Sequence, residues 1–180
     1  YKVLWRQIYG FLTYWSVIYS LIVSVLLIFF IPDQAKQDTV LIILLNVLPL
    51  VVFGPAGTLG GLYFQLKQQP TQIMVRSVLI GLVTLVLNIY FIKYLRMGYL
   101  GWFAAGAISQ VLSNFSYFVP LNFSAKISPI FNFKWRTIKK QLKTTLPTIP
   151  HYYSSYFIGA FDRVIMKFYG VSTSSIGKYN

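Results

Sequence analysis

The chain has 180 residues, of which 56% are hydrophobic and only 11% charged, and its mean hydropathy is +0.62. Soluble domains carry about 25% charged residues, so this chain has too little polar surface to cover a water-facing shell. Three acids, one histidine and no cysteine exclude disulfides and thiolate metal sites and leave too few ligands for a metal hydrolase. The net charge of +13 would favour nucleic-acid binding in a soluble protein, but in so apolar a chain it indicates membrane topology.

The charged residues divide the chain into long uncharged stretches, and a membrane-spanning helix needs about 20 predominantly apolar residues. The pattern predicts an all-α polytopic membrane bundle with five transmembrane helices, near residues 9–31, 40–63, 73–95, 99–121 and 145–169. The short connections between them predict that neighbouring helices run antiparallel. Soluble core helices are the competing interpretation, and five such windows in 180 residues argue against it.

The predicted helices group into three parts along the chain. Residues 1–121 hold four helices that end a first bundle, 122–143 form a basic cytoplasmic loop, and 144–180 hold the first helix of a second bundle. The chain starts at Tyr1, directly before a full-length apolar span, and stops at Asn180 without a polar tail. We therefore expect it to be an internal segment of a longer membrane protein.

The first two predicted helices contain polar and helix-breaking residues in a pattern. In the first, Thr13, Ser16, Ser20 and Ser24 follow helical spacing and form one stripe, which is typical of helix packing. The second contains prolines and glycines that predict a bend, because proline removes a backbone donor; they are Pro49, Gly54, Pro55, Gly57, Gly60 and Gly61. A bent helix suits a transporter that changes shape, although static kinks are also common in membrane proteins.

The third and fourth predicted helices contain three amide side chains. In the fourth, a row of small residues repeats every four positions from Gly101 to Ser113 and predicts close helix packing. A neighbouring row ends in Gln110 and Asn114, and the third helix contains Asn88. These three amides favour either a hydrated lumen or hydrogen bonds between helices, since a polar side chain facing hydrocarbon is costly.

The predicted loops carry charge unequally on the two sides of the membrane. The side with the N-terminus and the loops after the second and fourth helices carries ten cations and no acid. The other side carries five cations together with Asp33 and Asp38. The positive-inside rule therefore predicts that the N-terminus of the chain is cytoplasmic.

The most basic segment, residues 131–143, alternates aromatic residues with cations (FNFKWRTIKKQLK). It is either an interfacial helix that binds anionic lipid headgroups or a polyphosphate, or a topology signal alone. The topology signal is the simpler interpretation, because cations in a cytoplasmic loop need no ligand to explain them. The candidates for headgroup contact are Lys134, Arg136, Lys139 and Lys140.

The fifth predicted helix contains the ionisable residues that lie deepest in an apolar stretch. His151 and Asp162 are separated by about three turns and share one face, and Arg163 points roughly 100° away. The pair Asp162 and Arg163 either serves a function or marks the outer interface, since such residues inside a membrane cost about 2.5–3.5 kcal/mol each. His151 is either a proton-sensitive group or a hydrogen-bonded polar residue near the cytoplasmic end.

Several motifs follow one another in this last part of the chain: LPTIPH at 146–151, SS at 154–155, DRVIM at 162–166, YG at 169–170 and IGKY at 176–179. In this order they resemble the seventh helix of the Wzx-type polysaccharide flippases. These flippases are the O-antigen and capsule transporters of the multidrug/oligosaccharidyl-lipid/polysaccharide exporter superfamily. The short turn at 97–101 and the basic segment at 126–143 agree with the layout of that family.

The resemblance implies helices three to seven of a 12–14-helix transporter in the bacterial inner membrane, not an enzyme. Its implied role is to move an undecaprenyl-diphosphate-linked oligosaccharide to the outer leaflet for surface polysaccharide biosynthesis. The implied partners are that substrate, membrane lipids, a polysaccharide polymerase and glycosyltransferases, with no nucleic acid, metal or cofactor. The candidate substrate pathway consists of Arg163, which offers charge to the diphosphate, and of Asp162, His151, Asn88, Gln110 and Asn114.

Two other functions are left open by the sequence. A cation-coupled multidrug exporter of the same superfamily would need acids inside the membrane, whereas Asp33 and Asp38 lie in a loop. A membrane-embedded transferase would need a catalytic pair, and His151 and Asp162 lie about 16 Å apart along one helix. Neither class has the residues it needs within these 180 positions.

Overall fold

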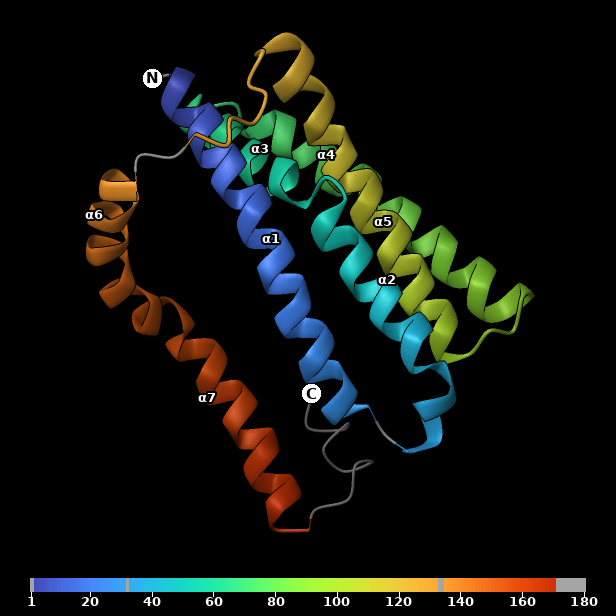
Figure 1. The fold of residues 1–180 in the computed structure, drawn as a ribbon. Helices are drawn as coiled ribbons and strands as arrows, with labels where there is room; N and C mark the ends of the chain where they lie inside the picture. Colours follow the sequence, from blue (N-terminus) through green and yellow to red (C-terminus); the bar gives the residue numbers. More distant parts are fainter. Residues whose placement is uncertain (1, 32, 133–134, 171–180) are drawn as a thin grey trace. The chain divides into compact units, whose positions relative to one another are not determined.

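The computed structural model of the chain describes residues 2–31, 33–132 and 135–170, and within them every regular element is helical. The predicted all-α class is thereby confirmed for the described residues. The chain forms two compact units, Tyr1–Asn132 and Phe133–Asn180, and each is described here by itself (Figure 1).

The first unit is a helical bundle in which the last α-helix makes the most extensive contacts. Its helices are α1 (Lys2–Phe30), α2 (Thr39–Val51), α3 (Gly54–Leu66), α4 (Pro70–Asn88) and α5 (Tyr99–Val119). A 3₁₀ turn (Asp33–Asp38) precedes α2, and π-helical turns extend α4 to Tyr94 and α5 to Ser124. Helix α5 packs against α2, α3 and α4, and α1 packs against α2 and α3 (Figure 1).

Two of these helices are long and apolar enough to cross a membrane, Lys2–Phe30 and Pro70–Tyr94. The bent pair Ala35–Val51 and Gly54–Leu66 makes a third if it forms one span. The described residues therefore support two or three spans, fewer than the five predicted. The predicted fourth span is α5, whose glycines, serines and amides lower its hydropathy. The predicted fifth is α7, which contains charged residues and tyrosines.

The second predicted helix, 40–63, is two helices whose axes differ by 43°. Helix α2 contains Pro49 two residues before its end, and Phe53 then adopts a left-handed conformation with φ of 58°. Pro55 occupies the first turn of α3, where a missing N–H costs nothing. The expected bend is thus a break, because an L-residue with positive φ cannot continue a right-handed helix.

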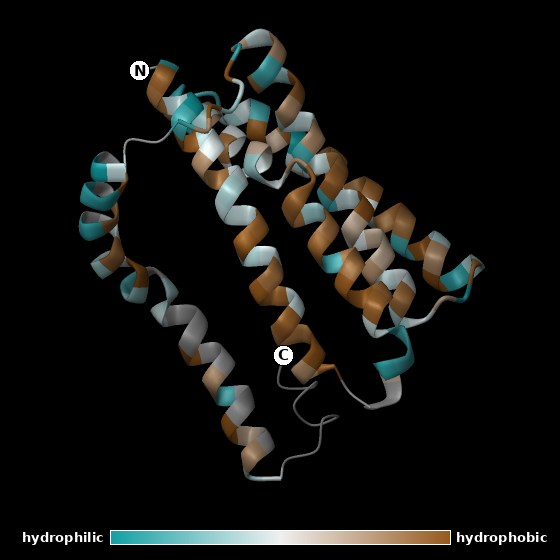
Figure 2. Cartoon of the chain, viewed as in Figure 1, coloured by the Kyte–Doolittle hydropathy of each residue, from teal (hydrophilic) through white to brown (hydrophobic). Residues whose placement is uncertain are grey.

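At each end of the first unit, a hydrogen bond joins segments that are distant in sequence. At one end the Arg6 Nε donates a hydrogen bond of 3.0 Å to the carbonyl of Ser128. At the other end the Tyr99 hydroxyl donates to the Asp38 carboxylate. This is the antiparallel order expected from the short connections. The middle stretches of the helices between these ends are mostly apolar, as their brown colour in Figure 2 shows.

The core of the first unit lies where α1, α3 and the segment after α5 meet. Its buried members are Tyr9, Ala56, Leu59, Leu121 and Ile127. The segment after α5 lies across α1, and its Ile130 N–H donates to the carbonyl of Arg6 at 3.0 Å. Gly10 makes this approach possible, since a Cβ there would lie 2.2 Å from the Ile130 carbonyl oxygen.

The second unit contains α6 (Trp135–Thr145), a 3₁₀ turn (Leu146–Thr148) and α7 (Ile149–Phe168). The segment predicted as a basic loop, 122–143, therefore includes most of a helix, and its residues up to Asn132 belong to the first unit. In α6 the exposed apolar side chains of Trp135 and Leu142 lie two turns apart on one face. Four cations follow the same spacing beside that face: Arg136, Lys139, Lys140 and Lys143.

Candidate functional site

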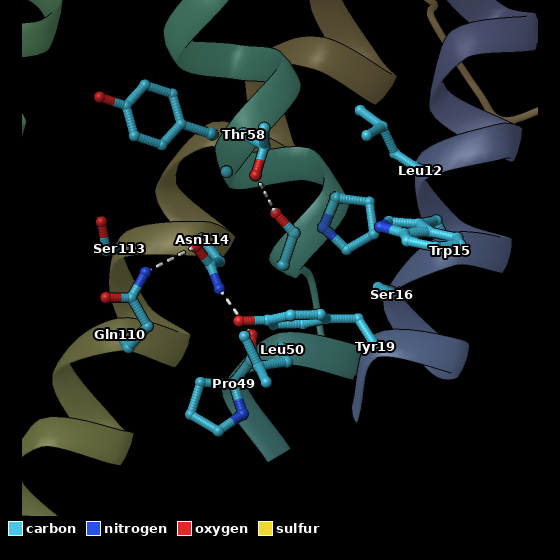
Figure 3. A pocket seen from close by; sticks show the side chains of 14 residues that line it. Leu12, Trp15, Ser16, Tyr19, Pro49, Leu50, Thr58, Gln110, Ser113 and Asn114 are labelled. Carbon is cyan, nitrogen blue, oxygen red and sulfur yellow. Dashed lines mark hydrogen bonds between the residues drawn. The ribbon is translucent and has the colours of Figure 1, made fainter. Parts of the chain in front are cut away.

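A cavity of about 470 Å³ lies beside the break between α2 and α3 in the first unit. It receives side chains from α1, α2, α3 and α5 (Figure 3). None of its lining residues is charged. We call it the break cavity, and its aromatic and polar side chains include Trp15, Tyr19, Thr58, Gln110, Ser113 and Asn114.

The aromatic wall of the break cavity comes from α1. Trp15 and Tyr19 are one turn apart and about half exposed, at 49% and 47%. Both project from α1 toward the break, on the side opposite the amides of α5 (Figure 3). The cavity therefore has flat apolar surfaces on one side and hydrogen-bonding groups on the other, an arrangement typical of small-molecule sites.

The amide wall of the break cavity comes from α5. Asn114 is buried, and its Nδ2 donates a hydrogen bond of 2.9 Å to the carbonyl of Pro49 on α2. Gln110, one turn earlier, donates through Nε2 to the Asn114 Oδ1 at 3.1 Å (Figure 3). Both ends of the Asn114 amide are thus bonded within the protein, and its orientation is determined by these partners.

A second cavity of about 480 Å³ lies between α2, α4 and α5. We call it the amide cavity because it is lined by Asn46, Asn88 and Gln110, together with Trp102. The Asn88 Nδ2 donates to the Thr84 carbonyl at 2.9 Å, while its Oδ1 is buried without a hydrogen-bond partner. A buried acceptor without a partner costs about 1–3 kcal/mol, so a ligand or water that donates to it is stabilised there.

The hydroxyl side chains of the stripe on α1 are satisfied within their own helix. Thr13, Ser16, Ser20 and Ser24 each donate to a carbonyl three or four residues earlier in α1. Bonds of this kind satisfy a hydroxyl within its own helix. The stripe on α1 therefore agrees with the packing interpretation, whereas Asn114 reaches across to another helix.

The structure brings together three of the six residues predicted for the substrate pathway. Gln110 lines both cavities, Asn114 lines the break cavity and Asn88 the amide cavity. His151 and Asp162 are exposed on α7, in the second unit. Arg163 belongs to α7, but its side chain lies outside the described part of the chain.

The residues predicted to contact lipid headgroups belong to the second unit as well. Arg136, Lys139 and Lys140 are exposed on α6, while Lys134 lies outside the described residues. Among the residues that the structure describes, no group of acids and histidines could hold a metal ion.

Sequence reasoning missed the aromatic wall and one amide. Trp15 and Tyr19 were counted only as part of an apolar span, because aromatic residues are common in such spans. Asn46 is an amide in an uncharged stretch, and the criterion that selected Asn88 would also have selected it. Their joint position depends on the break between α2 and α3.

Comparisons of the chain with protein-family models, with curated proteins and with solved structures find no match. The two cavities and the resemblance in the last helix are therefore the observations that bear on function.

Proposed function

We propose that this chain is part of a transporter that moves a lipid-linked oligosaccharide across the bacterial inner membrane. The observation that carries the proposal is the uncharged break cavity, with Trp15 and Tyr19 opposite Gln110 and Asn114. A saccharide ring has apolar faces that stack on aromatic rings and a rim of hydroxyls that bond to amides. Of the helices that line the cavity, α1 is long and apolar enough to span a membrane, and α2 and α3 together are so if the bent pair forms one span.

The resemblance of residues 146–179 to the polysaccharide flippases supports the same class of substrate. In this proposal the chain contributes five helices to a 12–14-helix transporter, with its N-terminus in the cytoplasm. Helix α5 then spans the membrane inside the bundle, where three neighbouring helices shield its amides from lipid. The undecaprenyl diphosphate is the proposed anchor of the sugar, and Arg163 is the proposed partner of its phosphates.

The role of Arg163 predicts a charge-dependent effect on export. In the full-length protein, Arg163→Ala should lower the amount of surface polysaccharide several-fold, and Arg163→Lys should retain more, because both arginine and lysine pair with phosphate. Lipid-linked intermediates should accumulate on the cytoplasmic face in the alanine strain. If the alanine strain made wild-type amounts of polysaccharide at normal protein levels, Arg163 would have no role in the substrate pathway. If no lipid-linked intermediate accumulated in that strain, the proposed transport reaction would be contradicted.

We further propose that α6 lies at the membrane surface and binds anionic headgroups. Its apolar residues Trp135 and Leu142 would enter the interface, and the cations beside them would contact phosphates, at about 1 kcal/mol per cation. If the cations of α6 serve only as a topology signal, the position of the helix at the membrane should not depend on headgroup charge.

This predicts a response to lipid composition. An environment-sensitive fluorophore at Leu142→Cys should report an apolar surrounding in phosphatidylglycerol nanodiscs but a polar one in phosphatidylcholine. Changing Arg136, Lys139 and Lys143 to Gln should shift that response to about tenfold more anionic lipid, since the attraction is electrostatic and screened by salt. The same change at Lys36, Lys93 and Arg96 is the charge-matched control. An equal signal in both lipids would leave only the topology interpretation.

A further inference from the structure

The break between α2 and α3 leaves one carbonyl without its helical donor. In a continuous helix the Pro49 carbonyl would accept from the N–H of Phe53. Here α2 ends at Val51, and Val52 is extended, with ψ of 109°. The donor is replaced by the Asn114 Nδ2, at 2.9 Å, from a residue 65 positions away. A side chain of α5 thus satisfies a backbone group that the break has exposed.

The left-handed residue at the break is held by the same helix. Phe53 has φ of 58°, a conformation that is strained for a residue with a side chain. Its ring contacts Phe115 and Phe118 on α5, with centroids 5.3 and 4.7 Å away. Relaxation of Val52 and Phe53 together to right-handed conformations would relieve the strain and let the Phe53 N–H approach the Pro49 carbonyl. Pro55 has no N–H to bond to the Val51 carbonyl, so the second state is a less bent pair of helices and not one continuous helix.

The position of the Asn114 amide depends on one glycine. A Cβ at Gly57 would lie 2.2 Å from the Asn114 Oδ1, inside any allowed contact. A Cβ at Gly61, one turn later on α3, would meet nothing within 4 Å. Glycine at position 57 therefore gives α5 the clearance to place its amide on α2.

We infer that the α2–α3 break is a hinge and that the Asn114–Pro49 hydrogen bond is the latch that holds it bent. Its consequence for the break cavity is direct, because residues on both sides of the break line that cavity: Pro49 and Leu50 from α2, and Gly54, Pro55, Gly57 and Thr58 from α3. Straightening the pair changes the distance between these two sets, and with it the volume of the cavity. The inference concerns the conformation of the bundle and does not depend on the proposed substrate.

The test is a distance measurement across the break in the full chain in nanodiscs. Spin labels at Val40→Cys on α2 and Leu66→Cys on α3 are suitable because both positions are exposed and the chain has no cysteine of its own. The native protein should give one narrow distance distribution. Asn114→Ala should add a longer, broader component and raise the ratio of straight to bent molecules about tenfold, since the Pro49 carbonyl loses its partner.

Gly57→Ala provides an independent route to the same result, because it displaces the amide without removing it. Gly61→Ala is its matched control and should leave the native distribution unchanged. A native distribution in both Asn114→Ala and Gly57→Ala would overturn the latch. Equal broadening of the distance distribution in Gly57→Ala and Gly61→Ala would also overturn the latch. The broadening would then come from alanine in α3 itself and not from displacement of the Asn114 amide. If one of the two latch variants fails to fold, the other decides the result.

Discussion

Gly10→Ala should lower the free energy of unfolding of the first unit by about 1–3 kcal/mol, the cost of forcing extra volume into a closely packed contact. The added Cβ would lie 2.2 Å from the carbonyl oxygen and 2.7 Å from the carbonyl carbon of Ile130. These are backbone atoms, so no side chain can rotate away. The segment from Ala125 to Asn132 would have to leave α1, with loss of the bond between the Ile130 N–H and the Arg6 carbonyl.

Gly81→Ala is the matched control for Gly10→Ala. It also lies within a helix, but a Cβ there meets nothing within 4 Å. Alanine has the higher helix propensity by about 0.8–1.0 kcal/mol, so this variant should be neutral or slightly stabilised. Titration with sodium dodecyl sulfate, followed by far-ultraviolet circular dichroism, measures both. Two variants of equal stability would show that the segment after α5 does not lie on Gly10.

If the chain is part of the transporter proposed above, Tyr19→Ala should lower export of the oligosaccharide by that transporter tenfold or more. Truncating an aromatic anchor in a binding cavity costs about 2 kcal/mol, and about 1.4 kcal/mol is a factor of ten. Tyr19 forms the aromatic wall of the break cavity with Trp15, opposite the amides of α5 (Figure 3). Tyr19→Phe retains the flat ring and should therefore retain most of the export.

Tyr14→Ala is the control for the loss of an aromatic residue from α1. Tyr14 is exposed to a similar extent, 58% against 47% for Tyr19, and does not line the cavity. Surface polysaccharide normalised to protein amount is the measurement, with lipid-linked intermediates as the second readout. If Tyr14→Ala and Tyr19→Ala reduced export equally, the break cavity would not be the sugar site.

Local sequence patterns predicted much of the helical arrangement. Uncharged stretches between charges located α1 and α4, because a helix that faces lipid cannot contain charges along its length. They also located the helix α5, predicted at 99–121 and found at Tyr99–Val119, but its serines and amides keep its hydropathy below that of a candidate span. The repeat from Gly101 to Ser113 correctly indicated close packing: Ala105 is fully buried, and a Cβ at Gly101 would lie 3.1 Å from Phe91.

The candidate site could be predicted only in part. The amides Gln110 and Asn114 stood out because polar side chains in an apolar helix need a partner, and their spacing placed them on one face. The partner itself was not predictable, since the Pro49 carbonyl is free only if the helix breaks at Phe53. Prolines and glycines indicated a bend in that region, but no local pattern places a left-handed residue at a phenylalanine.

The sequence by itself determined the class of this protein: an apolar, basic, helical chain whose short connections make its helices alternate in direction. Composition and periodicity are enough to determine this class, because composition indicates whether a segment prefers lipid or water, and periodicity indicates which side of a helix is polar. Only the tertiary structure decided that Trp15 and Tyr19 of α1 lie opposite the amides of α5, and that Asn114 bonds to Pro49. Contacts of this kind join residues tens of positions apart, and they follow from the packing of α1, α2, α3 and α5 around the break.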